Sequence, residues 1–252
     1  MDKRERVCLI TGSSGAIATA ICQEMAKTCK TIIGFEYPGV NQDNVKKIVE
    51  AEGAEFIGVE VDISNEESVK KGFEVVKKIG RLDILGNVAA IAPNNGPNGL
   101  PYFVDQTPFD EWKKVIEVNL NGTFLMTREA LPYMVKNNWG RIISVVSQTM
   151  RQATYIAGSH YPSSKGGVSA LTRTVAAEYG RFGITANLIA PGWTETKMMT
   201  SPAPQEYIDA TPLGRVARPS DHAPAFAFLA SEGAGFITGV TIDINGGFFI
   251  PM

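Results

Sequence analysis

The chain contains few cysteines, and they form no pattern that typically binds a metal. Its 252 residues include only Cys8, Cys22 and Cys29, with no Cys-x-x-Cys pair among them. An odd number of cysteines argues against a disulfide framework. We therefore expect three small free thiols in a reducing compartment, and no bound metal.

The sequence also lacks a strong excess of charge and a long apolar run. Its formal net charge is -2, which gives no electrostatic reason to expect a nucleic-acid partner. The N-terminal residues lead directly into a strand pattern, without the apolar segment of a secretion signal or a membrane span. We therefore expect a cytoplasmic protein that binds neither nucleic acid nor a membrane.

Short apolar runs alternate with amphipathic stretches along the whole chain, and several runs are apolar on both faces, as in strands covered by helices on either side. The alternation predicts an α/β fold: a doubly wound, Rossmann-like parallel sheet of about seven strands in three αβα layers. No shift in composition divides residues 1–252, which are predicted to form a single domain. The predicted strands are 7–11, 31–35, 55–61, 82–88, 141–147, 184–189 and 240–244.

Two helix starts are predicted from local signals. Ser64 is followed three residues later by Glu67, as in a capping box. Thr107 and Pro108 supply an N-cap and a proline for the first helical position of a helix that runs to about Met134.

Two loops interrupt the alternation. Residues 91–106 are rich in Asn, Gly and Pro, and the second loop covers residues 193–218. Ligands of open α/β sheets bind beyond the carboxyl ends of the strands, and both loops follow a strand. These loops are therefore the predicted walls of a substrate pocket.

A turn with two glycines follows the first strand and reads Thr-Gly-Ser-Ser-Gly-Ala-Ile-Ala. Glycine allows the backbone to approach a pyrophosphate closely, and the N-terminus of the following helix offers free N–H groups. The turn residues predicted to contact a dinucleotide are Gly12, Ser14, Gly15, Ala16 and Ile17.

Acidic residues end the second and third strands. A carboxylate at Glu36 can accept hydrogen bonds from both adenosine ribose hydroxyls and would repel a 2′-phosphate, which favours NAD over NADP. The alternative for Glu36 is a solvated loop residue. Asp62, followed by Ile63, can meet the adenine edge or can cap the helix that starts near Ser64.

Tyr161 and Lys165 stand four residues apart, so on a helix they share one face. A nearby ammonium favours the phenolate and lowers the pKa of a tyrosine, which is about 10 when unperturbed. Such a tyrosine can take the proton from a substrate hydroxyl as hydride leaves to NAD, or return it in the reverse direction.

Two more residues complete the predicted catalytic set. Ser147 ends the fifth strand, where its hydroxyl can hydrogen-bond the substrate oxygen. Asn119 lies within a helical stretch, where its side-chain amide can hold a water that connects Lys165 to solvent. The alternatives are a strand-end serine, a helix asparagine, a surface tyrosine and a solvated lysine.

These motifs resemble the short-chain dehydrogenase/reductase family, in its single-domain branch, over nearly the whole chain. The family's Tyr-x-x-x-Lys pair matches Tyr161 and Lys165, its serine matches Ser147, and its asparagine matches Asn119. Its Asn-Asn-Ala-Gly motif is similar to residues 87–90 and its Pro-Gly motif to residues 191–192. The resemblance implies an NAD(P)-dependent alcohol dehydrogenase or ketoreductase that forms a homotetramer or homodimer. It implies further cofactor contacts at Asn87, Ala89, Tyr161, Lys165, Pro191, Gly192, Thr194 and Thr196.

The chain departs from the family pattern in the first turn. Ala16 and Ala18 occupy the two later glycine positions, and Gly15 lies one place early. Because both positions fall at the start of a helix, we expect the added methyl groups to pack.

The substrate contacts predicted from position are Ser147, Arg151, Trp193 and Lys197. One hypothesis is that Arg151 or Lys197 binds an anionic or polyhydroxylated substrate, and the alternative is that both are solvated. Three functions stay open. They are an NAD-dependent dehydrogenase of a sugar, polyol, hydroxy-acid or sterol-like alcohol, a 3-oxoacyl-thioester reductase, and a non-catalytic nucleotide-binding sensor.

Overall fold

A computed structural model of the chain describes residues 5–152, 157–196 and 202–251. Seven parallel strands form one sheet in the order β3-β2-β1-β4-β5-β6-β7, which confirms the predicted doubly wound architecture. From β1, the strands β2 and β3 are added toward one edge of the sheet, and β4 to β7 are added toward the other edge, so the strand order reverses between β1 and β4. The strands are β1 (Val7–Thr11), β2 (Thr31–Glu36), β3 (Glu55–Glu60), β4 (Ile84–Asn87), β5 (Gly140–Val145), β6 (Ile184–Pro191) and β7 (Thr241–Ile244).

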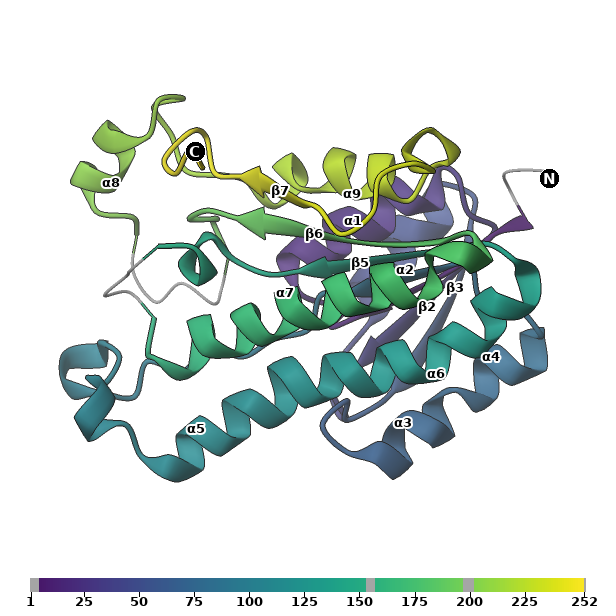
Figure 1. The fold of residues 1–252 in the computed structure, drawn as a ribbon, viewed down its shortest axis with the longest axis horizontal. Coiled ribbons are helices and arrows are strands. Elements are labelled where there is room, and N and C mark those ends of the chain that lie inside the picture. Colours follow the sequence, from purple (N-terminus) through teal and green to yellow (C-terminus); the bar gives the residue numbers. More distant parts are fainter. Residues whose placement is uncertain (1–4, 153–156, 197–201, 252) are drawn as a thin grey trace.

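Helices cover both faces of the sheet (Figure 1). One face carries α1 (Ala16–Ala26), α2 (Asp43–Ala51) and α9 (Ala223–Leu229). The other carries α3 (Glu66–Gly72), α4 (Glu74–Ile79), α5 (Phe109–Ile116), α6 (Gly122–Asn137) and α7 (His160–Tyr179). A short helix, α8 (Gln205–Ala210), lies beyond the ends of the strands. No helix within the described residues is long and apolar enough to cross a membrane.

Two apolar layers hold the helices against the sheet. Neighbouring residues of β1 point to opposite faces, so that Leu9 belongs to the layer under α6 and Ile10 to the layer under α1 and α9. All five residues of β1 are buried, as expected for a strand covered on both sides. The three cysteines are free and buried in the layer under α1.

Helices α3 and α5 begin one residue later than the local signals predicted. Asn65 caps α3 in place of Ser64, whose amide and hydroxyl both donate to the carboxylate of Asp62, at 2.9 and 2.6 Å. Helix α5 begins after Pro108, and the Thr107 hydroxyl donates to an earlier backbone carbonyl. In each case the expected capping side chain has a nearer partner in the preceding turn.

The predicted continuous helix up to about Met134 is also interrupted. A π-helical segment, Glu117–Asn121, joins α5 to α6, and α6 extends to Asn137. Single-turn π segments leave one residue out of the regular ladder and occur frequently at functional sites. Residue Asn119, one of the predicted catalytic residues, lies in this segment.

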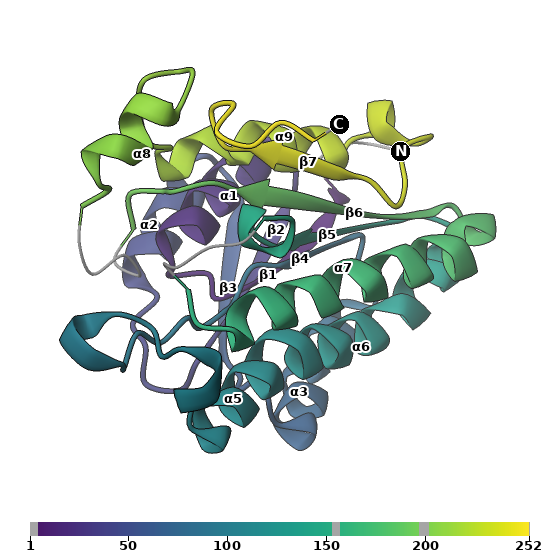
Figure 2. The same cartoon turned by 60° about the vertical axis from the view of Figure 1, so that its left-hand side comes forward.

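The described parts of both predicted loops lie at the end of the sheet where the strands terminate (Figure 2). Residues 91–106 contain two short 3₁₀ turns, Pro97–Gly99 and Val104–Gln106. The described part of residues 193–218 contains α8. Because all the strands are parallel, every strand-to-helix connection opens on this same edge.

Strand β4 and helix α9 approach each other closely at Gly86. A methyl group on this residue would lie 2.4 Å from Cδ1 of Ile10 and 2.9 Å from Cζ of Phe226. On α7, by contrast, a methyl group at Gly166 would meet no described atom within 4 Å.

We expect Gly86→Ala to lower the free energy of unfolding by about 1–3 kcal/mol, because the added methyl overpacks the core. The matched change Gly166→Ala should raise it by about 0.5–1 kcal/mol, since alanine restricts the unfolded chain and fits an open helical position. Chemical denaturation of both variants measures the difference. Equal stability of Gly86→Ala and the wild type would contradict the packing described for α9.

Candidate active site

A cavity of about 930 Å³ lies along the carboxyl ends of the strands. It spans the reversal of strand order between β1 and β4, where ligands of open α/β sheets bind. Residues after β1, β2, β3, β4, β5 and β6 all contribute to its wall. Among the described residues, the predicted site residues line this cavity with three exceptions, which are Asn87, Asn119 and Arg151.

The start of α1 opens onto the cavity. Gly12 adopts a φ of +63°, and a side chain there would press on the backbone of Ala89 at 3.0 Å. Gly15 is the N-cap of α1, and no described side chain accepts a hydrogen bond from the first amides of the helix. Ala16 and Ile17, the first two residues of α1, line the cavity. Free amides at a helix N-terminus suit a phosphate group. The methyl of Ala18 packs in the core, whereas that of Ala16 is exposed, so only one of the two added methyls behaves as expected.

Glu36 ends β2 at the far end of the cavity from Tyr161. One of its carboxylate oxygens accepts a hydrogen bond from the Ser14 amide at 2.8 Å and the other from the Tyr37 amide at 3.0 Å. Each oxygen retains acceptor capacity for a ligand hydroxyl. This arrangement fits the ribose of an adenosine and would repel a 2′-phosphate.

Asp62 does not cap α3, which Asn65 caps, but it lies on the cavity wall. Its carboxylate accepts from Ser64, and the residue also lines the cavity together with Ile63. An adenine ring at this end of the cavity would therefore lie beside a carboxylate that is already held in place.

Tyr161, Lys165 and Ser147 meet at the opposite end of the cavity. The Lys165 ammonium lies 5.7 Å from the centre of the Tyr161 ring and donates to the Val145 carbonyl at 2.7 Å. Ser147 hydrogen-bonds the Tyr161 phenol. The Ser147 hydroxyl also accepts from the Thr149 amide at 3.2 Å, which fixes its rotamer. A phenol, an ammonium and a hydroxyl thus surround one point on the cavity wall.

Burial dominates the titration of this group. It raises the pKa of Tyr161 to about 12, although the hydrogen bond from Ser147 acts in the opposite direction. It lowers the pKa of Lys165 to about 8. The predicted lowering of the tyrosine pKa is therefore wrong, because desolvation of the phenol dominates its titration. At neutral pH Tyr161 is a phenol, which is the form that donates a proton.

Asn119 joins the loop 91–106 to α7. Its amide nitrogen donates to the Ile91 carbonyl at 3.0 Å and to the Ser164 hydroxyl at 3.1 Å. Its amide oxygen accepts from the Ile91 N–H at 2.9 Å. Both donors of this buried side chain are used. The amide therefore holds the loop against α7, in place of the water-binding role that the sequence predicted.

The other two exceptions also lie outside the cavity wall. The Asn87 amide donates to Thr127 and Ser144, at 3.3 and 3.2 Å, and so ties β4 to α6 and β5. Arg151 forms an ion pair with Asp243 of β7 at 3.3 Å, which already neutralises its charge. Lys197 lies outside the described residues. No group of three His, Cys, Asp or Glu side chains in the described part of the chain is arranged to hold a metal ion.

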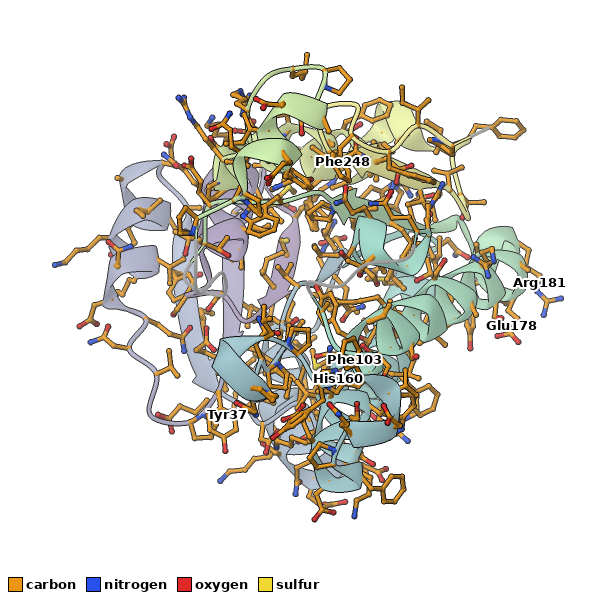
Figure 3. The ribbon with its side chains drawn as sticks, turned by 90° about the vertical axis from the view of Figure 1, so that its left-hand side faces the viewer. Tyr37, Phe103, His160, Glu178, Arg181 and Phe248 are labelled. Atoms are coloured by element: carbon orange, nitrogen blue, oxygen red, sulfur yellow. The ribbon has the colours of Figure 1, made fainter. Side chains whose placement is uncertain are left out.

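An aromatic cluster that the sequence did not reveal packs behind Trp193, which lines the cavity. Tyr207 of α8 stacks on Phe248, with ring centres 4.1 Å apart, and packs against Trp193 at 5.4 Å. In Figure 3, which looks onto the carboxyl ends of the strands, Phe248 lies beside the ribbon of α8. These residues are far apart in the sequence, and no local pattern indicates that they meet.

Comparison with known proteins places the chain among relatives of similar length. Residues 12–249 match a family model described as enoyl-(acyl carrier protein) reductase. The chain is 33% identical over 252 residues to 3-oxoacyl-[acyl-carrier-protein] reductase FabG of Aquifex aeolicus, covering 97% of each chain. It is 31% identical over 252 residues to glucose 1-dehydrogenase 2 of Bacillus subtilis, covering 98% of this chain and 95% of that one.

Solved structures show the same fold. A 3-oxoacyl-[acyl-carrier protein] reductase of Brucella melitensis with bound NAD superposes with a TM-score of 0.90 at 27% identity. The match covers 99% of this chain and 93% of that one.

The buried Lys165 makes the stability of the protein depend on pH. Its pKa is about 8 in the fold and about 10.4 in an unfolded chain. The unfolded state therefore binds more protons between these values, and the free energy of unfolding rises with pH across this window. At pH values below about 8, we expect Lys165→Met to be more stable than the wild type by up to about 3 kcal/mol. This advantage should vanish above a pH of about 10.4, where the lysine is neutral in both states.

Denaturant titrations at several pH values measure this difference between variant and wild type. Lys47→Met, a change to an exposed lysine of α2, is the matched control and should differ from the wild type by an amount that does not vary with pH. A pH-independent difference for Lys165→Met would show that its burial does not shift its titration.

Proposed function

Because this chain belongs to the short-chain dehydrogenase/reductase family, we propose that its cavity interconverts a ketone and a secondary alcohol with a nicotinamide cofactor. One observation carries the proposal. Tyr161, Ser147 and Lys165 converge at one end of a cavity whose other end offers a free helix N-terminus and the Glu36 carboxylate.

The cavity fits a dinucleotide along its length. The amides at the start of α1 would bind the pyrophosphate, Glu36 the adenosine ribose, and Asp62 with Ile63 the adenine. Ala89, Pro191, Gly192, Thr194 and Thr196 line the remainder of the wall. When bound, the nicotinamide ring supplies or accepts the hydride. We propose NAD(H), supported by the charge of Glu36 and by the NAD found in the Brucella melitensis reductase.

The chain's own residues would move the proton. In the reducing direction the Tyr161 phenol donates its proton to the ketone oxygen, for which its high pKa makes it the available form. Ser147 holds the same oxygen through its hydroxyl. The positive charge of Lys165 favours the phenolate that remains until a proton is regained from solvent. Oxidation of the alcohol follows the same steps in reverse.

Two substrate classes have support. Reduction of a 3-oxoacyl thioester is supported by the Aquifex aeolicus relative, and oxidation of a sugar or polyol by the Bacillus subtilis relative. A non-catalytic sensor is not supported, because it would have no need for a half-buried Tyr161 beside the buried Lys165. Assembly as a homotetramer or homodimer stays a prediction.

We expect Tyr161→Phe to lose turnover by about 10²–10⁴-fold, because it removes only the proton donor. Binding of NADH, followed by its fluorescence, should be unchanged, since the ring is retained. Tyr179→Phe, at the other end of the same helix, is the control and should retain full turnover. If Tyr161→Phe still reduced ketones at the wild-type rate, the mechanism would have to be abandoned.

Glu36→Gln keeps the shape of the side chain and removes its charge. We expect the preference for NADH over NADPH, measured as a ratio of kcat/KM values, to fall by about tenfold, because repulsion of the 2′-phosphate is lost. Glu60→Gln, on the neighbouring strand end and outside the cavity wall, should leave the ratio unchanged. An unchanged ratio in Glu36→Gln would argue against the ribose role of this carboxylate.

A further inference from the structure

A buried histidine, His222, lies behind Thr194 of the cavity wall and is used by no step of the proposed mechanism. It joins the 3₁₀ turn Pro219–Asp221 to helix α9 and is fully buried. Its Nε2 lies 2.9 Å from the Thr194 hydroxyl, whereas its Nδ1 is buried without a hydrogen-bond partner among the described residues. A buried ring with an unpaired nitrogen costs stability, so packing alone does not account for a histidine at this position.

The Thr194 hydroxyl is held from two sides. It contacts the Gly192 carbonyl at 3.0 Å as well as Nε2 of His222. A hydroxyl has one hydrogen and two acceptor positions, and a carbonyl can only accept. Whichever nitrogen of His222 carries the proton, the hydroxyl hydrogen therefore has an acceptor within the protein, and at least one acceptor position of the hydroxyl stays free. Thr194 lines the cavity, so its hydroxyl suits an N–H donor of a ligand.

The contact joins two neutral groups. Burial lowers the pKa of His222 to about 4, although the charge of Asp221 acts in the opposite direction. The imidazole is therefore uncharged at neutral pH. An oxidised nicotinamide ring is positively charged, and a neutral imidazole near it does not repel that charge.

We propose that His222 is a positioning residue, which fixes the Thr194 hydroxyl so that it accepts a hydrogen bond from the carboxamide of a bound nicotinamide. The inference rests on the proposed function, because it requires the nicotinamide to lie at the Tyr161 end of the cavity. The backbone of Thr194 is already fixed by its bridge to Ala217, so the side-chain torsion is the freedom that remains. Without His222, only the Gly192 carbonyl would hold the hydroxyl.

The test is a double-mutant cycle on NADH affinity, measured by NADH fluorescence with the full-length protein. His222→Leu removes both ring nitrogens, and we expect it to weaken NADH binding about fivefold, the equivalent of one hydrogen bond. Thr194→Val removes the hydroxyl, keeps the shape of the side chain and should weaken binding by a similar factor. Because His222 acts through Thr194, adding His222→Leu to Thr194→Val should cause no further loss.

Two further variants serve as rescue and control. His222→Gln, whose amide nitrogen can take the place of Nε2, should recover most of the affinity that His222→Leu loses. Thr185→Val is the matched control for Thr194→Val, since Thr185 is also buried and lies on β6, outside the cavity wall. It should leave NADH affinity unchanged. Denaturation without cofactor checks that each variant is folded, and His222→Asn, whose amide is too short to reach Thr194, replaces His222→Leu in the cycle if the latter does not fold.

The outcomes separate this inference from the proposed function. An equal loss of affinity in the Thr194 and Thr194→Val backgrounds, or no loss in either, overturns the role of His222. Unchanged NADH binding by Thr194→Val overturns the carboxamide contact and this inference, but leaves proton transfer by Tyr161 standing. Failure of the wild type to bind either NADH or NADPH overturns the proposed function, and this inference with it.

Discussion

The parallel direction of all seven strands is the constraint on which the rest of the molecule depends. A parallel sheet must be covered by helices on both faces, which accounts for the two apolar layers and for the full burial of β1, β4, β5 and β6. The same geometry brings every strand end to one edge. Residues from six strand ends therefore line one cavity, although they are spread from Gly12 to Thr196 in the sequence.

Desolvation is the main cause of the shifted pKa values of Tyr161 and Lys165 at that edge. The same burial that raises the pKa of Tyr161 lowers that of Lys165, so the two pKa values move apart, to about 12 and about 8. The phenol is thereby kept as a proton donor at neutral pH. The charge that develops when it gives up its proton would meet an ammonium that is fixed by the Val145 carbonyl. Burial of the Lys165 ammonium costs stability, as its lowered pKa shows, and in the proposed mechanism the charge favours the phenolate.

A set of buried amides connects the loops to this centre. Asn119, which lies in the π-helical segment between α5 and α6, ties the loop that begins at Ile91 to the catalytic helix. Gln148 and the Tyr207 hydroxyl similarly link the segment after β5 to α8. These side chains make contacts between segments that no local sequence signal relates. The other end of the cavity, by contrast, is lined by residues of the β1–α1 turn and of the segments at the ends of β2 and β3.

The sequence by itself determined the strands, the doubly wound sheet and most of the cavity wall, because hydrophobic periodicity and glycine turns are local signals. It also placed Tyr161, Lys165, Ser147 and Glu36 on that wall, since each lies at a strand end or a helix start. The sequence could not give the capping of α3 by Asn65, the partners of Asn119 or the position of Tyr207. Tertiary structure decided these, and also the direction of the Tyr161 pKa shift, because burial and hydrogen-bond partners depend on which distant segments pack together.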